Sequence, residues 1–215
     1  MNKQELLTKI QLYVIADKKT CGDKNIEEVV CRAIEGGAEM IQYRDKESDD
    51  ANFLKIASKL KDICKETNVP FIINDRVRIA LQTDADGVHL GQEDLSIREA
   101  RGNLGSEKII GKSARTIQQA KQAEEEGADY VGVGPIFHTL SKQINKPIGL
   151  HIIHEAKDTL KIPFFSIGGI NLRNLDQVIQ AGGKRIAVIS AVASSDDVRS
   201  SAAKLLEKLA HQNLT

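Results

Sequence analysis

The feature that most constrains this chain is an alternation, repeated eight times, between a short apolar run and a longer amphipathic stretch. The apolar runs are rich in Ile and Val, and polar residues do not occupy every second position. This pattern predicts strands that are buried on both faces of a parallel sheet. The runs are Leu12–Ala16, Met40–Tyr43, Pro70–Asn74, Gly87–Leu90, Lys108–Lys112, Tyr130–Gly134, Pro163–Ile167 and Arg185–Ser190.

The stretches between the runs carry apolar residues at three- and four-residue spacing, which predicts helices. Eight strands that are each followed by a helix favour a closed barrel over an open, doubly wound sheet. The 215 residues suit a lean barrel with few insertions. We therefore predict an α/β fold, a single-domain (β/α)₈ TIM barrel. The expected helices are Ile26–Glu35, Ala51–Glu66, Val77–Leu81, Ile97–Arg101, Ile117–Glu125, Leu150–Asp158, Leu172–Gln180 and Val198–Ala210.

Three glycine-containing turns mark places where a helix ends just before a strand. They are Gly36–Ala38, Gly127–Asp129 and Ala181–Gly183. Glycine at such a position supplies the left-handed residue that closes a helix. No linker, low-complexity tract or shift in composition interrupts the chain, so residues 1–215 are expected to form one catalytic barrel domain.

Composition argues against nucleic acid and membranes as partners. The chain has 30 Lys plus Arg and 30 Asp plus Glu, so no overall charge steers it toward polyanions. Aromatic residues make up 4% and Trp is absent, which disfavours a stacking platform for single strands. The N-terminus has no apolar leader and no apolar run approaches ~18 residues, so a cytoplasmic location is expected. The odd number of cysteines without CxxC spacing predicts free thiols.

Polar residues concentrate after the carboxyl ends of the predicted strands, where the chemistry of such barrels takes place. Gln42, Arg44 and Lys46 follow the second strand at every second position, so an extended segment points all three side chains to one side. Two cations and an amide aimed together suit a phosphate-rich anion. A solvated charged loop is the alternative interpretation of these residues.

Two aspartates follow neighbouring strand ends. Asp75 comes after the third strand and Asp94 after the fourth, so the barrel brings them close together. Mg²⁺ typically takes one or two carboxylates and completes its shell with water and substrate phosphates. Helix capping is the alternative for both aspartates. His89, at the end of the fourth strand, either ligates a metal or packs in the interior.

A second anion site is predicted after the seventh and eighth strands. Gly168 and Gly169 allow the backbone to approach a ligand closely, and Ser190 stands at the corresponding position after the last strand. Loops in these two positions commonly bind phosphate in TIM barrels. Two anion sites imply two phosphorylated ligands, or one ligand with phosphate at both ends.

Together these segments resemble the thiamine-phosphate synthase family, and they follow the family's order along nearly the whole chain. The two longest blocks, ADGVHLGQEDL and ADYVGVGPIFHTLSK, are the most specific. The matching segments are LYVIAD at 12–17, QYRDK at 42–46, INDR at 73–76, ADGVHLGQEDL at 85–95, IIGKS at 109–113, ADYVGVGPIFHTLSK at 128–142, IGGI at 167–170 and VISAV at 188–192.

The resemblance implies a Mg²⁺-dependent transferase that joins a hydroxymethylpyrimidine pyrophosphate to a thiazole phosphate and releases pyrophosphate. It places Mg²⁺ on Asp75 and Asp94. It gives catalytic roles to Arg44, Lys46, Ser113 and Lys142. The implied pyrimidine pyrophosphate ligands are Gln42, Tyr43, Arg44, Asp45, Lys46, Asn74, Ser113 and Lys142. The implied thiazole phosphate ligands are Thr139, Leu140, Ser141, Gly169, Ile189 and Ser190.

The chain departs from the family pattern at three positions. Asp45 stands where Glu is usual, Ser141 replaces a Thr, and Ala16 replaces a Thr in the first strand. Asp45 and Ser141 keep the type of functional group, so we expect altered affinity and not loss of activity. The electron-rich aminopyrimidine of the implied substrate can delocalise a developing cation, which favours a dissociative path. Such a path needs no protein nucleophile, and the sequence offers no obvious one.

Two alternatives remain at this point. A thiazole tautomerase-like paralogue would bind only a thiazole phosphate, with His138 as a candidate acid or base. A non-catalytic regulator would bind thiamine phosphate without turnover. The retained pyrophosphate and metal residues favour the synthase. The sequence is compatible with a homo-oligomer but does not fix the oligomeric state.

Overall fold

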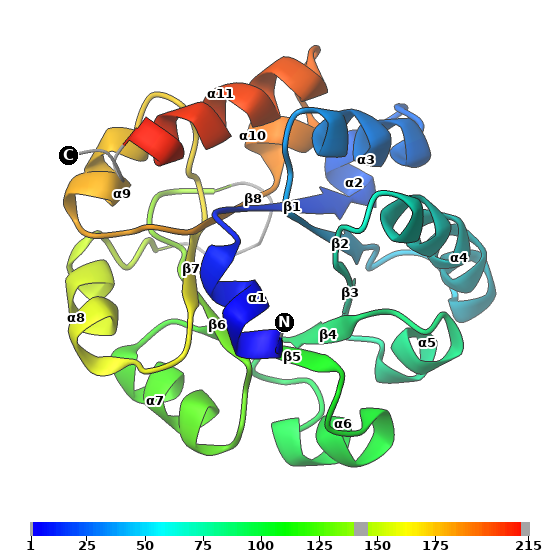
Figure 1. Cartoon of the computed structure of the whole chain (residues 1–215), viewed down its shortest axis with the longest axis horizontal. Helices are drawn as coiled ribbons and strands as arrows, with labels where there is room; N and C mark the ends of the chain where they lie inside the picture. The colour runs from blue at the N-terminus through cyan, green and yellow to red at the C-terminus, as the bar shows by residue number, and fades with distance from the viewer. Residues whose placement is uncertain (1, 140–145, 212–215) are drawn as a thin grey trace.

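The computed structural model describes residues 2–139 and 146–211, which form a closed barrel of eight parallel strands in sequence order (Figure 1). The last strand pairs with the first, as Leu12 lies beside Ile186. The prediction of a (β/α)₈ TIM barrel is therefore confirmed. The strands are β1 Leu12–Asp17, β2 Met40–Arg44, β3 Phe71–Asn74, β4 Gly87–Leu90, β5 Ile109–Ala114, β6 Tyr130–Val133, β7 Phe164–Ile167 and β8 Ile186–Val188.

Helices surround the barrel, and three of them have the bounds that the apolar spacing predicts. These three are α3 Ile26–Glu35, α7 Ile117–Glu125 and α11 Val198–Ala210. The other helices are α1 Lys3–Lys9, α2 Lys18–Cys21, α4 Asp50–Glu66, α5 Val77–Gln82, α6 Ile97–Leu104, α8 His151–Thr159, α9 Leu175–Gln180 and α10 Ser190–Ala193.

The sequence pattern differs from the structure at the eighth strand and around the short helices. The strand predicted over Arg185–Ser190 is wrong at its end, because Ser190 already opens α10. Helix α9 begins at Leu175 and not at Leu172, since the preceding residues form a turn in which Asn174 accepts a bond from the Asn171 amide. The short helices α1, α2 and α10 have too few turns to show a clear period.

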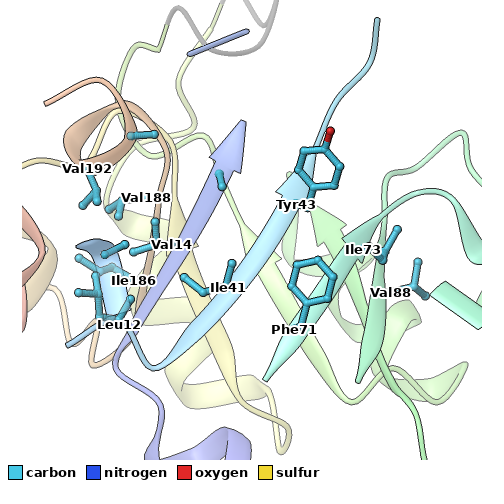
Figure 2. Close-up of a cluster of buried hydrophobic side chains, with 14 of the residues drawn as sticks. Leu12, Val14, Ile41, Tyr43, Phe71, Ile73, Val88, Ile186, Val188 and Val192 are labelled. Carbon is cyan, nitrogen blue, oxygen red and sulfur yellow. The ribbon is translucent and has the colours of Figure 1, made fainter. Parts of the chain in front are cut away.

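Alternate residues of the strands build two separate apolar shells. Val14 and Ile41 face outward and pack under the helices, as Figure 2 shows for this part of the core. Tyr13, Met40 and Phe165 face inward and fill the barrel. Because both faces of every strand are buried, the strands read as continuous apolar runs.

Acidic side chains accept hydrogen bonds from backbone N–H groups at the amino-terminal edge of the barrel. Glu39 stands just before β2 and accepts the backbone N–H groups of Gln11 and Leu12 at 2.6 and 3.1 Å. Asp86 and Asp129 precede β4 and β6, and accept the N–H groups of Phe71 in β3 and Ile110 in β5, both at 2.8 Å. Each acid thereby pairs an N–H group at the barrel edge and helps to fix the strand register.

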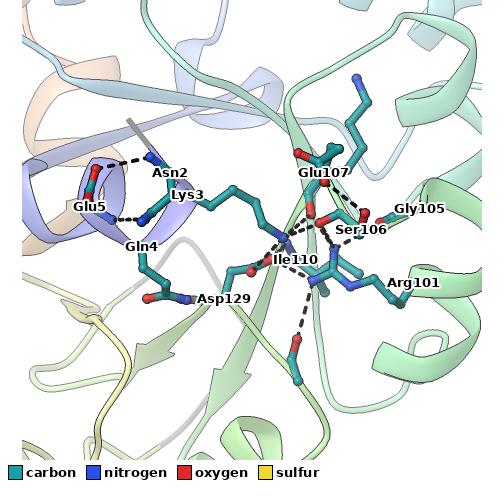
Figure 3. Close-up of polar contacts among 12 residues, drawn as sticks. Asn2, Lys3, Gln4, Glu5, Arg101, Gly105, Ser106, Glu107, Ile110 and Asp129 are labelled. Atoms are coloured by element: carbon teal, nitrogen blue, oxygen red, sulfur yellow. Dashed lines mark hydrogen bonds and ion pairs between the residues drawn. The ribbon is translucent and has the colours of Figure 1, made fainter.

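Helix α1 closes the barrel at this same end and lies across its centre in Figure 1. Asn2 and Glu5 form a reciprocal cap at its start, and Leu7 is fully buried in the inner shell. Lys3 from α1 and Arg101 from α6 both contact the Asp129 carboxylate, at 3.0 and 2.7 Å (Figure 3). The amino-terminal end is thus filled, which leaves the opposite rim for ligands.

The described residues include no helix that is long and apolar enough to cross a membrane.

Candidate active site

A cavity of about 500 Å³ opens at the carboxyl ends of the strands. Lys46, Asp94 and Ser113 line one part of it. Gly169 and Ser190 line another. The structure therefore brings residues from both predicted anion sites to one cavity, although they come from strands on different sides of the barrel.

Two carboxylates and a lysine meet at the β3–β4 side of this rim. Asp75 has left-handed backbone geometry, with φ of 60°, and its N–H donates to the His89 carbonyl at 2.9 Å. That bond helps to hold its carboxyl group beside that of Asp94. Lys46 donates to Asp75. Asp94 also accepts the Gly91 N–H at 2.7 Å, so both carboxyl groups are held in place.

The proximity of the two acids shows in the pKa of Asp75. Burial raises its pKa, and the neighbouring Asp94 carboxyl raises it further, while Lys46 opposes the change. Two anionic groups held together in this way favour a cation between or beside them.

This donor set fits Mg²⁺. In the described part of the chain no group of three or more His, Cys, Asp and Glu side chains gathers around one point. A pair of carboxylates beside an open cavity is what Mg²⁺ uses when water and substrate phosphates supply its other ligands. Zinc would need more protein ligands than this rim provides.

Arg44 and Gln42 point inward from β2 but sit deeper than Lys46. Arg44 forms an ion pair with Asp17 at the end of β1, and both side chains are largely buried. Asp17 in turn accepts from Thr20 N and Oγ1 at 2.8 and 2.7 Å. Gln42 is 1% exposed and donates to the Tyr13 hydroxyl. The guanidinium is therefore preoriented by Asp17.

The side chains of Tyr43 and Asp45 are not brought into the cavity. The Tyr43 ring faces outward, is fully buried, and packs 4.3 Å from the Phe53 ring. Asp45 accepts the Glu47 and Ser48 N–H groups at 3.0 Å, and the Ser48 hydroxyl at 2.6 Å. Burial opposes its ionisation, but these hydrogen bonds outweigh burial and lower its pKa. Asp45 therefore shapes the loop that carries Lys46.

Asn74 and Ser113 end up at different depths. Asn74 closes β3 and is 7% exposed, directly before the carboxylate pair. Ser113 lines the cavity, and its Oγ lies 2.9 Å from His89 Nε2. His89, for which the sequence left packing and metal binding open, is 7% exposed and hydrogen-bonds inside the barrel.

The second part of the cavity is built mostly from backbone. Gly168 and Gly169 have φ of 99° and 66°, a region that favours glycine. A side chain at Gly169 would come within 2.3 Å of the His138 carbonyl. Ile189 and Ser190 lie opposite at the start of α10, and Thr139 joins the lining from the loop after β6.

Three predicted ligands, Leu140, Ser141 and Lys142, lie outside the described residues.

Some residues at the rim were missed by sequence reasoning. Arg115 lines the cavity just after β5, and Gln92 both lines it and donates to the Ser113 carbonyl. Asp17 orients Arg44. All three stand at a strand end or just after one, so their position alone could have singled them out, but isolated polar residues at such positions are too common to be informative.

The comparisons with known proteins agree with this geometry. The family model described as thiamine monophosphate synthase matches residues 12–192. A thiamine-phosphate synthase of Coprothermobacter proteolyticus is 45% identical over 209 residues, which cover 97% of this chain and 99% of that protein. The solved structure of a thiamine phosphate pyrophosphorylase from Pyrococcus furiosus has a TM-score of 0.88 and 38% identity, and the match covers 96% of this chain and 98% of that one.

Some relatives are longer. A thiamine-phosphate synthase of Prochlorococcus marinus (strain MIT 9303) is 42% identical over 207 residues, and the match covers 96% of this chain but 59% of that protein. This chain thus spans about 59% of the length of that relative. With a family model that matches from the first strand into α10, and with full-length relatives above 40% identity, the chain belongs to the thiamine monophosphate synthase family.

Proposed function

We propose that this protein is a thiamine-phosphate synthase. It joins 4-amino-2-methyl-5-(diphosphooxymethyl)pyrimidine to 4-methyl-5-(2-phosphoethyl)thiazole, and releases thiamine phosphate and pyrophosphate. The observation that carries the proposal is that Lys46 and Asp94, both beside Asp75, line a cavity whose other lining includes Gly169 and Ser190. One part of the cavity suits a metal-bound diphosphate, and the other suits a monophosphate.

The proposed reaction breaks one bond and forms another. The carbon–oxygen bond between the pyrimidine methylene and the diphosphate breaks, and pyrophosphate leaves with the electron pair. The thiazole nitrogen then donates its lone pair to the methylene carbon. The electron-rich aminopyrimidine delocalises the developing positive charge, so the step needs no protein nucleophile.

The chain's residues act by placing charge where the leaving group forms. Mg²⁺ held by Asp75 and Asp94 would supply positive charge to the diphosphate oxygens. Lys46 and the preoriented Arg44 add fixed cationic donors, and Ser113 adds a neutral one. In preorganised sites of this type, removing one donor typically costs roughly 2.7–4 kcal/mol in the barrier. We assign the same role to Lys142.

The thiazole phosphate is assigned to the opposite part of the cavity. The Gly168–Gly169 backbone allows a phosphate to approach closely, and the Ser190 hydroxyl adds a donor. Thr139, Leu140, Ser141 and Ile189 complete this proposed subsite. Holding the thiazole nitrogen close to the methylene carbon is catalysis by positioning.

The test is direct product detection. The purified protein is mixed with both phosphorylated substrates and Mg²⁺, and thiamine phosphate and pyrophosphate are measured together. Equal amounts of both products are expected. Binding without pyrophosphate release would indicate a regulator, and conversion of a thiazole phosphate tautomer alone would indicate a tautomerase. Either result would overturn the proposed function.

A further inference from the structure

Inside the barrel a chain of hydrogen bonds runs from Gln42 to Ser113 through five different strands. Gln42 Nε2 donates to Tyr13 Oη, which lies 2.9 Å from Tyr130 Oη. Tyr130 Oη lies 2.9 Å from His89 Nδ1, and His89 Nε2 lies 2.9 Å from Ser113 Oγ. The first four members are at most 7% exposed, whereas Ser113 lines the cavity.

Two glycines make room for the rings in this chain. An added Cβ at Gly111 would lie 2.1 Å from Tyr130 Cζ, and one at Gly132 would lie 3.3 Å from His89 Cε1. The His89 and Tyr130 rings stack with centroids 5.5 Å apart. A larger residue at Gly111 would displace the Tyr130 ring, and one at Gly132 would crowd the His89 ring. Both glycines lie in strands, where glycine usually lowers stability. The space that they leave for the two rings accounts for their presence there.

Elementary donor counting gives the chain a direction. The Gln42 amide donates to Tyr13 Oη, and Tyr130 Oη is the other hydrogen-bond partner of this hydroxyl among the described residues. A chain in which every hydrogen is paired therefore directs the Tyr13 hydrogen at Tyr130. Tyr130 then donates to His89 Nδ1. A neutral imidazole that accepts at Nδ1 carries its hydrogen on Nε2, which donates to Ser113 Oγ. Burial raises the pKa of both phenols, so both keep the hydrogens that this direction requires.

We propose that Tyr13, Tyr130 and His89 are positioning residues that orient the Ser113 hydroxyl hydrogen toward the cavity, as a donor to the departing pyrophosphate. This inference rests on the proposed function and deepens it. Because Ser113 Oγ already accepts from His89, its own hydrogen is left for a ligand. The chain of bonds acts through Ser113 and does not itself contact substrate.

The tyrosine hydroxyls are otherwise difficult to explain. Phe165 fills the same layer of the barrel and packs 5.4 Å from each tyrosine ring without a hydroxyl. Burying a phenol hydroxyl is unfavourable unless it is hydrogen-bonded, and phenylalanine would avoid that cost. A packing role alone therefore predicts Phe at positions 13 and 130.

The first test needs no substrate. Nitrogen-15 chemical shifts of the histidine side chains report the tautomer, and comparison with His89→Gln identifies the His89 signals among those of the five histidines. We expect a neutral ring with hydrogen on Nε2. Hydrogen on Nδ1, or a doubly protonated ring at neutral pH, would overturn the proposed direction.

The second test is kinetic coupling. Tyr130→Phe removes the hydroxyl that fixes the His89 tautomer, so Ser113 can turn its hydrogen toward His89. We expect kcat to fall about ten- to hundredfold, the effect of one hydrogen bond to a charged group, with little change in the thiazole phosphate KM. Ser113→Ala should give a similar fall, and adding Tyr130→Phe to it should lower kcat no further.

Ser166→Ala is the matched control. Ser166 is a fully buried serine on β7 whose Oγ has no hydrogen-bond partner in the described structure, and it is not part of the chain of bonds. Its loss should leave kcat unchanged. Additive losses in the Ser113→Ala and Tyr130→Phe double variant would show that Tyr130 acts only through packing, and would overturn the inference. Absence of turnover in the unmodified protein would instead overturn the proposed function, while the tautomer test would still report on the chain of bonds.

Discussion

At the scale of single residues, Asp94 combines two tasks. Its carboxylate accepts a hydrogen bond from the Gly91 N–H at 2.7 Å, and it shares the proposed Mg²⁺ site with Asp75. An asparagine side chain can still accept the Gly91 bond, but it carries no charge for the metal. One substitution can therefore distinguish the role of Asp94 in holding the loop from its role in binding the metal.

We predict that Asp94→Asn keeps the fold and raises the Mg²⁺ concentration needed for half-maximal activity by at least about tenfold, the effect of losing ~1.4 kcal/mol of metal binding. A Mg²⁺ titration of the initial rate measures this directly. Glu93→Gln is the control, because it removes a neighbouring negative charge that also lines the cavity. An unchanged Mg²⁺ requirement in Asp94→Asn would contradict the metal assignment.

The three cysteines differ in burial and in thiol pKa. All three are free. Burial raises the pKa of Cys21 to about 11 and that of Cys64 to about 12, with smaller contributions from nearby carboxylates. Cys31 is only half-buried, and burial followed by Glu35 raises its pKa as well.

We predict that iodoacetamide at pH 8 modifies Cys31 first, then Cys21, then Cys64. The thiolate is the reactive form, so a raised pKa lowers the reactive fraction, and each unit of pH below the pKa reduces it about tenfold. Peptide mass spectrometry over time gives the order. Cys31→Ser should remove the fastest phase, and fastest labelling of Cys64 would contradict the burial of α4 against the barrel.

At the scale of elements, the loops after β6 and β7 pack closely against each other at Gly169. Gly169 has φ of 66°, and a Cβ there would lie 2.3 Å from the His138 carbonyl. Backbone strain and steric contact therefore both disfavour any residue other than glycine at position 169. A left-handed residue other than glycine typically costs roughly 1–2 kcal/mol even before the contact is counted.

We predict that Gly169→Ala raises the KM for the thiazole phosphate about tenfold or more, with a smaller effect on the KM for the pyrimidine pyrophosphate. Steady-state kinetics with each substrate varied in turn measures both. Gly102→Ala is the matched control, because this α6 glycine has open space around its Cβ position. It should leave both constants unchanged and stabilise the helix slightly. Equal effects on the two KM values would argue against a separate thiazole phosphate subsite.

At the scale of the whole molecule, stability and chemistry occupy opposite ends of the barrel. Helix α1 fills the amino-terminal end with Leu7, while the cavity opens at the carboxyl ends of the strands. The inner shell between them carries the tyrosine pair. Changes at the closed end should therefore affect unfolding without reaching the reaction.

We predict that Leu7→Ala lowers the free energy of unfolding by about 2–5 kcal/mol, since it leaves a cavity in the inner shell. For a chain of this size each kcal/mol corresponds to roughly 2–4 °C in Tm. Chemical denaturation measures the loss, and kcat and both KM values measured well below Tm should not change. A large change in kcat would mean that the two ends are coupled.

The sequence by itself determined the architecture, because a strand covered on both faces must be apolar throughout, and each covering helix must carry an apolar stripe. It also determined that Gln42 and Arg44 share one side of β2, with Lys46 two residues further along, since side chains alternate along a strand. Only the tertiary structure decided which of these reach the cavity. Lys46 lies on the rim, whereas Gln42 is enclosed with Tyr13.

Contacts between distant strands were beyond the sequence for a physical reason. The bonds that join Tyr13, Tyr130, His89 and Ser113 depend on how far each strand is shifted against its neighbours around a closed ring, and no local pattern encodes that stagger. The outward turn of Tyr43 and the pairing of Arg44 with Asp17 were decided in the same way. Periodicity fixes the face of a strand on which a side chain lies; closure of the barrel fixes its partner and its depth.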